Sequence, residues 1–282
     1  MIKILKRIMS KGVIKENKHM KKTLHTFVIC AYKESKYLEE CIKSLVNQTY
    51  KSKIIMITST PNDYIRYFAD KYGIELFINE GESGITQDWN FGLSKVRTKL
   101  ATIAHQDDIY EKEYTECIIK YLTHIKKPII LFTDYGEIRN GLKTTDVSML
   151  KIKRFMLSPL RIRAFKSCIF VRRRILSLGD AICCPSVCYA MDNLKLPIFQ
   201  NHYMCSEDWE AWENLSRMRG DFIYIPKPLM YHRIHEESTT SKALEMGTRV
   251  YENYEMFCKF WPKPIARIIN KFYTKSEDSN KL

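Results

Sequence analysis

Two adjacent carboxylates, Asp107 and Asp108, follow an apolar stretch at residues 100–104 that is predicted to be a buried strand. Hard divalent cations prefer oxygen ligands and usually retain waters and substrate phosphate oxygens. A short acidic loop at the end of a strand is therefore suited to holding a metal ion together with a diphosphate. A structural interpretation is also open, because Asp108 followed three residues later by Glu111 forms a helix capping box.

A second acidic pair, Glu207 and Asp208, stands at the start of a helix expected at residues 208–218. A carboxylate here is able to act as a general base if the fold points it at a hydroxyl group. Acidic residues are also favoured in the first turn of any helix, where they interact with the helix dipole. The pair is therefore either a catalytic group or a stabilised helix start.

Arg233 and His235 are two residues apart in an expected extended segment, so their side chains project to the same side. An arginine fork matches phosphate oxygens, and a neutral imidazole binds phosphate or a metal ion. The alternative is a pair of solvated surface cations.

Apolar and amphipathic stretches alternate regularly around the first acidic pair. The expected strands occupy residues 27–31, 54–57, 75–78, 100–104 and 129–133. The expected helices occupy residues 36–47, 64–71, 86–96 and 112–124. Such βαβ units indicate an α/β fold with a mainly parallel sheet and helices on both faces. Ligands bind at the carboxyl ends of the strands in these sheets.

The pattern is less regular after residue 135. We expect a helix at 154–166, the helix at 208–218, short strands at 168–171, 188–190 and 222–225, and one or two terminal helices within 241–275. The chain then divides into a basic N-terminal tail at 1–22, a main domain at 23–240 and a C-terminal helical extension at 241–282.

The order of the motifs is more specific than any one of them. The series runs through 27–34 (FVICAYKE), 44–50 (SLVNQTY), Gly84, 89–90 (WN), 106–108 (QDD), 207–209 (EDW) and 233–235 (RIH). Over roughly residues 25–240 it resembles the family 2 glycosyltransferases, inverting enzymes that use nucleotide sugars and have a Rossmann-like GT-A fold. The resemblance implies that residues 23–135 bind the nucleotide sugar and that 136–240 form the acceptor and catalytic half.

The resemblance also implies roles for individual residues. Asp208 would be the catalytic base, with Glu207 beside it. Asp108 would bind Mg²⁺ or Mn²⁺, with His235 as a further ligand. The nucleotide sugar would contact Ala31, Tyr32, Glu34, Thr58, Asp88, Asn90, Gln106, Asp107 and Arg233. The implied substrates are a nucleoside-diphosphate sugar and a hydroxyl of a cell-surface glycan or lipid-linked precursor.

Two positions depart from the family pattern. The family commonly has an Asp-Asp-Gly-Ser motif after the second strand, whereas residues 58–63 read TSTPND, so Thr58 offers only a neutral hydrogen bond. The metal motif begins with Gln106 instead of Asp, so fewer negative charges would surround a bound cation. These departures keep open an inactive GT-A relative that binds a nucleotide or a protein partner.

The formal net charge of +14 is concentrated in residues 1–22 and again in 151–174. Basic patches attract anionic lipid, nucleic acid or phosphorylated substrates alike. No RRM, zinc-finger or helix-turn-helix pattern supports nucleic acid as the partner, so we expect none. An anionic membrane surface remains a candidate partner.

No run of roughly 18 uncharged apolar residues is present, so we predict no membrane span. Lysines and an arginine interrupt every apolar stretch near the N-terminus that could serve as a signal peptide. The nine cysteines include no Cys-x-x-Cys pair, which favours reduced, buried thiols over disulfides or a zinc site. We expect a cytoplasmic protein that is also a candidate for binding at the inner face of the cell membrane.

Overall fold

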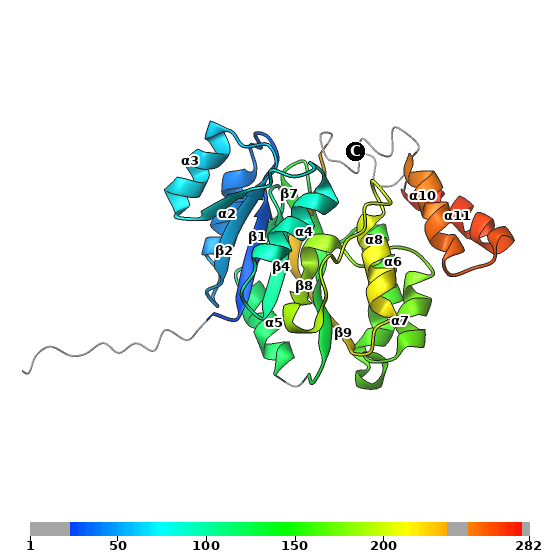
Figure 1. Cartoon of the computed structure of the whole chain (residues 1–282). Helices are drawn as coiled ribbons and strands as arrows, with labels where there is room; N and C mark the ends of the chain where they lie inside the picture. The colour runs from blue at the N-terminus through cyan, green and yellow to red at the C-terminus, as the bar shows by residue number, and fades with distance from the viewer. Residues whose placement is uncertain (1–22, 124, 236–247, 278–282) are drawn as a thin grey trace, which may run out of the picture.

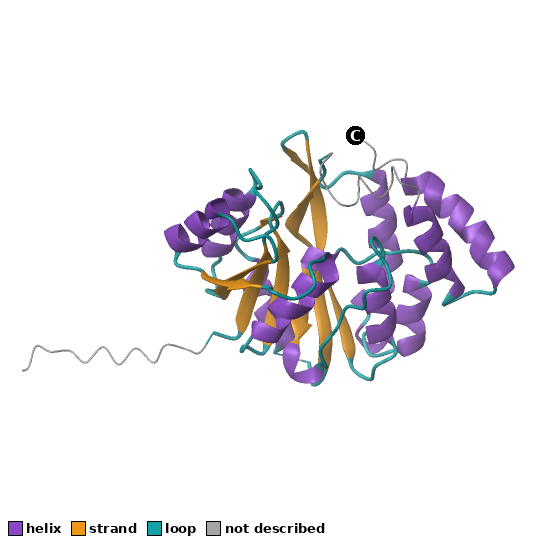
Figure 2. Cartoon of the chain, turned by 45° about the horizontal axis from the view of Figure 1, so that its top comes forward, coloured by secondary structure: helices purple, strands orange, loops and turns teal. Residues whose placement is uncertain are grey.

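The computed structural model describes residues 23–123, 125–235 and 248–277, and within them nine strands form one sheet (Figures 1 and 2). The strand order is β3-β2-β1-β4-β8-β6-β9-β5, and β7 pairs with β6 at the side. The expected α/β class of fold, with one sheet flanked by helices, is confirmed.

The first half of the chain forms the parallel part of the sheet. Its strands are β1 (His25–Cys30), β2 (Lys53–Thr58), β3 (Glu75–Ile78) and β4 (Leu100–His105). Its helices are α2 (Leu38–Val46), α3 (Asp63–Tyr72), α4 (Ile85–Lys95) and α5 (Tyr114–Leu122). Every element expected in this half is present. The capping-box interpretation of Asp108 is wrong, because a short strand intervenes and α5 begins only at Tyr114.

The second half adds the strands β5 (Ile109–Tyr110), β6 (Pro128–Arg139), β7 (Leu142–Thr144), β8 (Val187–Ala190) and β9 (Asp221–Arg233). Strand β8 lies between β4 and β6 and is antiparallel to both, whereas β6 and β9 are parallel. The sheet is therefore mixed beyond β4. Strand β9 also runs on through the two prolines that follow residue 225, and so reaches the acidic loop after β4.

The helices of the second half lie together at one side of the sheet (Figure 1). They are α6 (Ser148–Leu157), α7 (Ile169–Leu176), α8 (Glu207–Ser216), α10 (Thr248–Cys258) and α11 (Lys263–Glu277). Short 3₁₀ turns are η1 (Ser158–Arg161), η2 (Arg163–Phe165), η3 (Cys184–Ser186) and η4 (Met191–Asn193).

Two expectations for this region are wrong. The expected helix at 154–166 is α6, which begins earlier and ends before Pro159, whose ring opposes a continuing helix. The expected strand at 168–171 is the start of helix α7. Its apolar run reads as a strand, but buried Arg172 donates to the carbonyls of Ser216 and Gly220 and so holds the segment against the end of α8.

The core consists of two apolar clusters. One joins the sheet to α4, α8 and the C-terminal helices and includes the buried side chains of Trp209, Trp212 and Phe257. The other joins the sheet to α2, α3 and α5. Helices α10 and α11 thus pack on the main domain: the Tyr273 ring is 5.4 Å from that of Phe257 and 5.8 Å from that of Trp209.

Some predictions lie outside the described residues. These are the N-terminal tail at 1–22 and those parts of the C-terminal extension that fall at 241–247 and 278–282. Among the helices that are described, none combines the length and the apolar character that crossing a bilayer requires. All nine cysteines are described, and each is a free thiol.

Candidate functional site

The acidic loop after β4 meets the end of β9. Asp108 is fully buried, and its Oδ1 accepts a hydrogen bond from the backbone N–H of Arg233 and pairs with His232 Nδ1, both at 3.0 Å. Asp107 is less buried, and its Oδ2 lies 2.8 Å from Nε2 of His235. Because β9 extends past the sheet core, the two sequence motifs that contain these residues form one site.

Three side chains of this loop form a group that could hold a metal ion. Ligand atoms of His105, Asp107 and Asp108 all lie within 4.8 Å of one another. Nε2 of His105 and Oδ2 of Asp108 are buried and have no hydrogen-bond partner among the described residues. Burial lowers the pKa of His105, so its ring is neutral and retains a lone pair for a cation. The residue types and spacing of this group therefore fit a divalent ion, which prefers such ligands.

The two aspartates differ in what surrounds them. Burial opposes protonation of His232, but the charges of Asp108 and Asp107 outweigh burial and raise its pKa to about 9. His232 is then a cation at neutral pH and balances Asp108. Asp107 is the more accessible carboxylate of the two.

The side chain of Arg233 holds the acidic loop in place. Its Nε donates to the backbone carbonyl of Asp107 at 2.9 Å, and its Nη2 donates to Glu40 at 2.6 Å. The guanidinium also lies 4.2 Å from the ring centre of Tyr37, a cation–π contact. Arg233 is buried. Glu40 and Tyr37 were not predicted as site residues, because only the packing of α2 reveals that they face β9.

The loop after β1 is joined to the acidic loop by Gln106. Its side-chain amide accepts from the backbone N–H of Tyr32 and donates to the carbonyl of the same residue, both at 3.0 Å. The next residue, Lys33, has a left-handed backbone with φ of 53°, and its N–H donates to Thr60 Oγ1 at 2.7 Å. A non-glycine residue in this conformation is strained, and such strain gathers at functional sites. Ala31 is buried at the base of this loop, whereas Glu34 is exposed.

Three further residues that were predicted to contact the nucleotide sugar make hydrogen bonds within the protein. Thr58 accepts a hydrogen bond from the N–H of Thr60 at 3.0 Å. Asp88 accepts from Ser59 and from Asn79, both at 2.7 Å, which ties the ends of β2 and β3 to α4. The amide of Asn90 donates to the carbonyl of Phe199 and accepts from the N–H groups of Ile198 and Phe199. These contacts position loops, and direct contact with a ligand stays a prediction for all three.

The second acidic pair begins α8. Asp208 Oδ1 accepts from the N–H of Trp209 at 2.8 Å. Burial, reinforced by the charge of Glu207, raises the pKa of Asp208 to about 6. Burial also raises the pKa of Glu207 to about 7, and its Oε2 has no hydrogen-bond partner among the described residues. A carboxylate whose pKa lies this near neutrality is suited to general base catalysis.

Two further residues, Asp180 and Cys183, have pKa values that respond to the charges of the acidic sites. Burial and the charge of Asp208 raise the pKa of Asp180 to about 8. Burial raises the pKa of the Cys183 thiol, and Asp108 and Asp208 both raise it further. Cys183 is therefore within electrostatic reach of both acidic pairs. The sequence carried no signal for Asp180, and it marked Cys183 only as one of several cysteines that could have formed a zinc site, an interpretation that was not preferred.

An α/β sheet with an acidic loop after β4 and a second acidic pair at the start of α8 is the architecture of a GT-A glycosyltransferase. The model of glycosyl transferase family 2 matches residues 26–177, more than half of the chain, so the chain belongs to this family. An uncharacterized glycosyltransferase of Haemophilus influenzae is 25% identical over 232 residues, which cover 77% of this chain and 68% of that protein. One of Methanocaldococcus jannaschii is 25% identical over 229 residues, covering 76% and 72%.

Solved structures with the same fold include two with bound nucleotide sugars. S. aureus TarS 1–349 in complex with UDP-GlcNAc superposes with a TM-score of 0.60 at 16% identity, covering 90% of this chain and 72% of that one. The mannosyltransferase PcManGT from Pyrobaculum calidifontis, in complex with GDP-Man and Mn²⁺, has a TM-score of 0.61 at 13% identity, covering 91% and 73%. At these identities the likeness establishes the shared GT-A fold, while the family relatives support glycosyl transfer.

Proposed function

We propose that the protein transfers a sugar from a nucleoside-diphosphate sugar to an acceptor hydroxyl, with inversion, and that Asp208 is the catalytic base. One observation carries the proposal: a carboxylate pair with raised pKa values, buried Glu207 and partly buried Asp208, stands at the start of α8 in a chain whose acidic loop after β4 could hold a metal ion. Donor and acceptor chemistry would meet between these two pairs of acids.

The donor would bind at the carboxyl ends of β1 and β4. We assign its contacts to the loop at Ala31, Tyr32 and Glu34, with Gln106 holding the Tyr32 backbone in place. Arg233 would support this site indirectly, because its side chain donates a hydrogen bond to the backbone carbonyl of Asp107. Thr58, Asp88 and Asn90 would support this pocket through the loops that they tie together.

Mg²⁺ or Mn²⁺ is the cofactor that the acidic loop fits. Asp107 and His105 would hold it, together with Oδ2 of Asp108, which accepts no hydrogen bond from the described residues, and the imidazole of His235. When bound, such an ion offsets negative charge on a diphosphate leaving group. The neutral state of His105 and the pairing of Asp108 with His232 set the charge of this ligand group.

The proposed transfer step needs only one acid–base group, the carboxylate of Asp208. The acceptor oxygen forms a bond to the anomeric carbon while its proton passes to the Asp208 carboxylate. The bond from that carbon to the diphosphate oxygen breaks, and the nucleoside diphosphate leaves with the electron pair. Attack from the face opposite the leaving group inverts the anomeric centre, and no covalent sugar–enzyme intermediate forms.

Thermal stabilisation of the protein by a panel of nucleoside diphosphates, with and without Mn²⁺, tests the donor and metal sites together. We expect one nucleotide to raise Tm only with the ion, because a ligand that binds the folded state alone stabilises it. Asp107→Asn should lose this shift, and Asp146→Asn, a change at an exposed acid outside the site, should keep it. A shift that is unchanged in Asp107→Asn would contradict the proposed metal site.

The acceptor is proposed to be a cell-surface glycan or lipid-linked precursor, reached from the cytoplasm at an anionic membrane surface. Helix α11 supports a membrane partner, because exposed basic residues follow one another every four residues: Lys263, Arg267, Lys271 and Lys275. Ile268 and Phe272 on the same helix are 60% and 68% exposed. Basic residues beside exposed apolar ones are typical of helices that bind at a lipid interface.

A further inference from the structure

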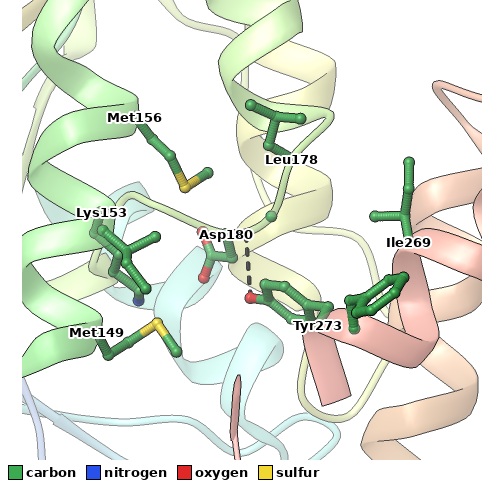
Figure 3. Close-up of a pocket in the computed structure, with 10 residues that line it drawn as sticks. Met149, Lys153, Met156, Leu178, Asp180, Ile269 and Tyr273 are labelled. Atoms are coloured by element: carbon green, nitrogen blue, oxygen red, sulfur yellow. Dashed lines mark hydrogen bonds between the residues drawn. The ribbon is translucent and has the colours of Figure 1, made fainter. Parts of the chain in front are cut away.

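A cavity of about 340 Å³ lies between α6, the turn that follows α7 and helix α11 (Figure 3). Most of its wall is apolar, and two methionines contribute to it. The apolar lining residues are Met149, Ile152, Met156, Leu178, Ile269 and Phe272. A cavity of this size holds a small molecule or one part of a larger one. Methionine walls adapt to flexible apolar chains.

Polar groups gather at one part of the lining. Asp180 stands between α6 and α11, where its backbone N–H donates to the hydroxyl of Tyr273 at 3.3 Å (Figure 3). Its Oδ1 is buried and has no hydrogen-bond partner among the described residues. Lys153 also lines the cavity. An unsatisfied carboxyl oxygen favours a ligand hydroxyl that donates to it, and the ammonium group of Lys153 favours an anionic group such as a phosphate.

The proposed base influences this polar part of the cavity electrostatically. The charge of Asp208 raises the pKa of Asp180, and the charge of Lys153 lowers the pKa of both carboxyls. Asp208 itself does not line the cavity, so a group held by Lys153 and Asp180 would lie on the side of the cavity that this carboxylate influences.

Part of the apolar lining is exposed to solvent. Ile152, Leu178 and Phe272 line the cavity and are 51%, 52% and 68% exposed. Helix α11 forms one wall, although it lies beyond residues 26–177 that match the family model. A water-soluble glycan makes poor use of such a wall, whereas an aliphatic chain buries apolar area against it.

We propose that this cavity receives the aliphatic chain of an amphipathic acceptor, while Lys153 and Asp180 bind the polar group that adjoins the chain on the side of Asp208. The inference rests on the proposed transferase function and specifies the acceptor as lipid-linked. It also assigns α11 a role in acceptor binding.

Calorimetric titration of the full-length protein with decyl phosphate, below its micelle concentration, tests this assignment. We expect saturable binding to the wild type and none for inorganic phosphate, which lacks the chain. Met156→Trp fills the cavity and should abolish binding. Phe155→Trp adds the same ring at the neighbouring, 80% exposed position outside the cavity and should retain it. Equal binding by the two variants would overturn the proposal, because the chain would then adsorb elsewhere.

A second variant guards against misfolding of Met156→Trp. Leu178→Glu places a charge on the exposed part of the lining, where folding tolerates it, and should weaken binding by roughly tenfold or more. The metal-dependent Tm shift with nucleoside diphosphates is measured on the same preparations. Loss of that shift with intact decyl phosphate binding would refute the donor site alone. Absent decyl phosphate binding with an intact shift would refute the cavity proposal alone.

Discussion

At the scale of single residues, Asp208 is the group on which the proposed chemistry depends. It is partly buried beside Glu207, and the pKa values of both carboxyls are raised because burial disfavours the charged form. A base of this kind removes a proton only when ionised. Its position at the start of α8 could be predicted from the sequence. Its electrostatic environment could not, because Asp180 and Lys153, whose charges interact with it, belong to other segments of the chain.

Asp208→Asn should lower the turnover number by about 10²–10⁴-fold, the usual contribution of a positioned general base. The amide retains the size of the carboxyl, so the metal-dependent Tm shift with nucleotide should persist. Transfer assays with radiolabelled donor, alongside the Tm measurement, check both expectations. Full transfer activity in the variant would show that Asp208 is not the base, whereas absence of transfer by the wild type would favour the alternative of an inactive relative whose partner binding is its function.

The pH dependence of transfer follows from the same groups. Activity should fall as the pH drops through about 6 to 7, where the carboxyl pair that includes Asp208 becomes protonated. A profile of kcat/KM from pH 5 to 9 measures this limb. An acidic limb centred near pH 4, the ordinary range of an exposed carboxyl, would show that this pair is not the base.

Glu207→Gln should stabilise the protein at pH 8. Burial raises the pKa of this carboxyl in the folded state from 4.5 to about 7, so its ionised form lowers the free energy of unfolding above pH 7. Removing the charge should recover on the order of 1–3 kcal/mol at pH 8 and little at pH 5, where the wild-type group is already neutral. Urea denaturation at both pH values tests this, and an equal effect at both would contradict it.

At the scale of elements, the parallel half of the sheet was predictable because each strand and helix has its own hydrophobic period. The strand expected at 168–171 failed for a physical reason. Ile169, Phe170 and Val171 have strand-forming side chains, but tertiary hydrogen bonds from Arg172 hold the segment as a helix. Local propensity does not contain such a contact. The hydrogen bond from Arg233 to Glu40, which helps to position the acidic loop, could not be predicted for the same reason.

Helix α4 approaches the sheet closely at Gly92. A Cβ atom there would lie 2.5 Å from Val28 Cγ1 and 3.0 Å from Ile57 Cγ1, on two buried strands. Gly92→Ala should therefore destabilise the protein by about 1–3 kcal/mol, despite the better helix propensity of alanine. Urea denaturation measures this cost. Ser94→Ala, an exposed change on the same helix, should leave stability nearly unchanged. Equal effects of the two changes would show that the close contact at Gly92 does not cause the destabilisation.

At the scale of the whole molecule, the helices α6, α7, α8, α10 and α11 lie together at one side of the sheet (Figure 1). The sheet is proposed to bind the donor, and the helical side contains the proposed base, the cavity and the basic row of α11. The sequence revealed the charge of this side but not its geometry, because the row of α11 and the exposed lining of the cavity come from separate segments. Their proximity places exposed apolar and basic groups beside the proposed acceptor site. A membrane that holds the acceptor would therefore meet this face.

Flotation with vesicles that contain anionic lipid tests that arrangement. The wild type should float at low salt and be released at high salt, because basic residues near a charged surface each contribute about 1 kcal/mol that salt screens. Replacing both Lys271 and Lys275 by Glu should weaken flotation strongly. The same change at Lys99 and Lys195, exposed lysines outside α11, is the matched control and should have a smaller effect. Equal loss in both variants would mean that net charge, and not this face, drives binding.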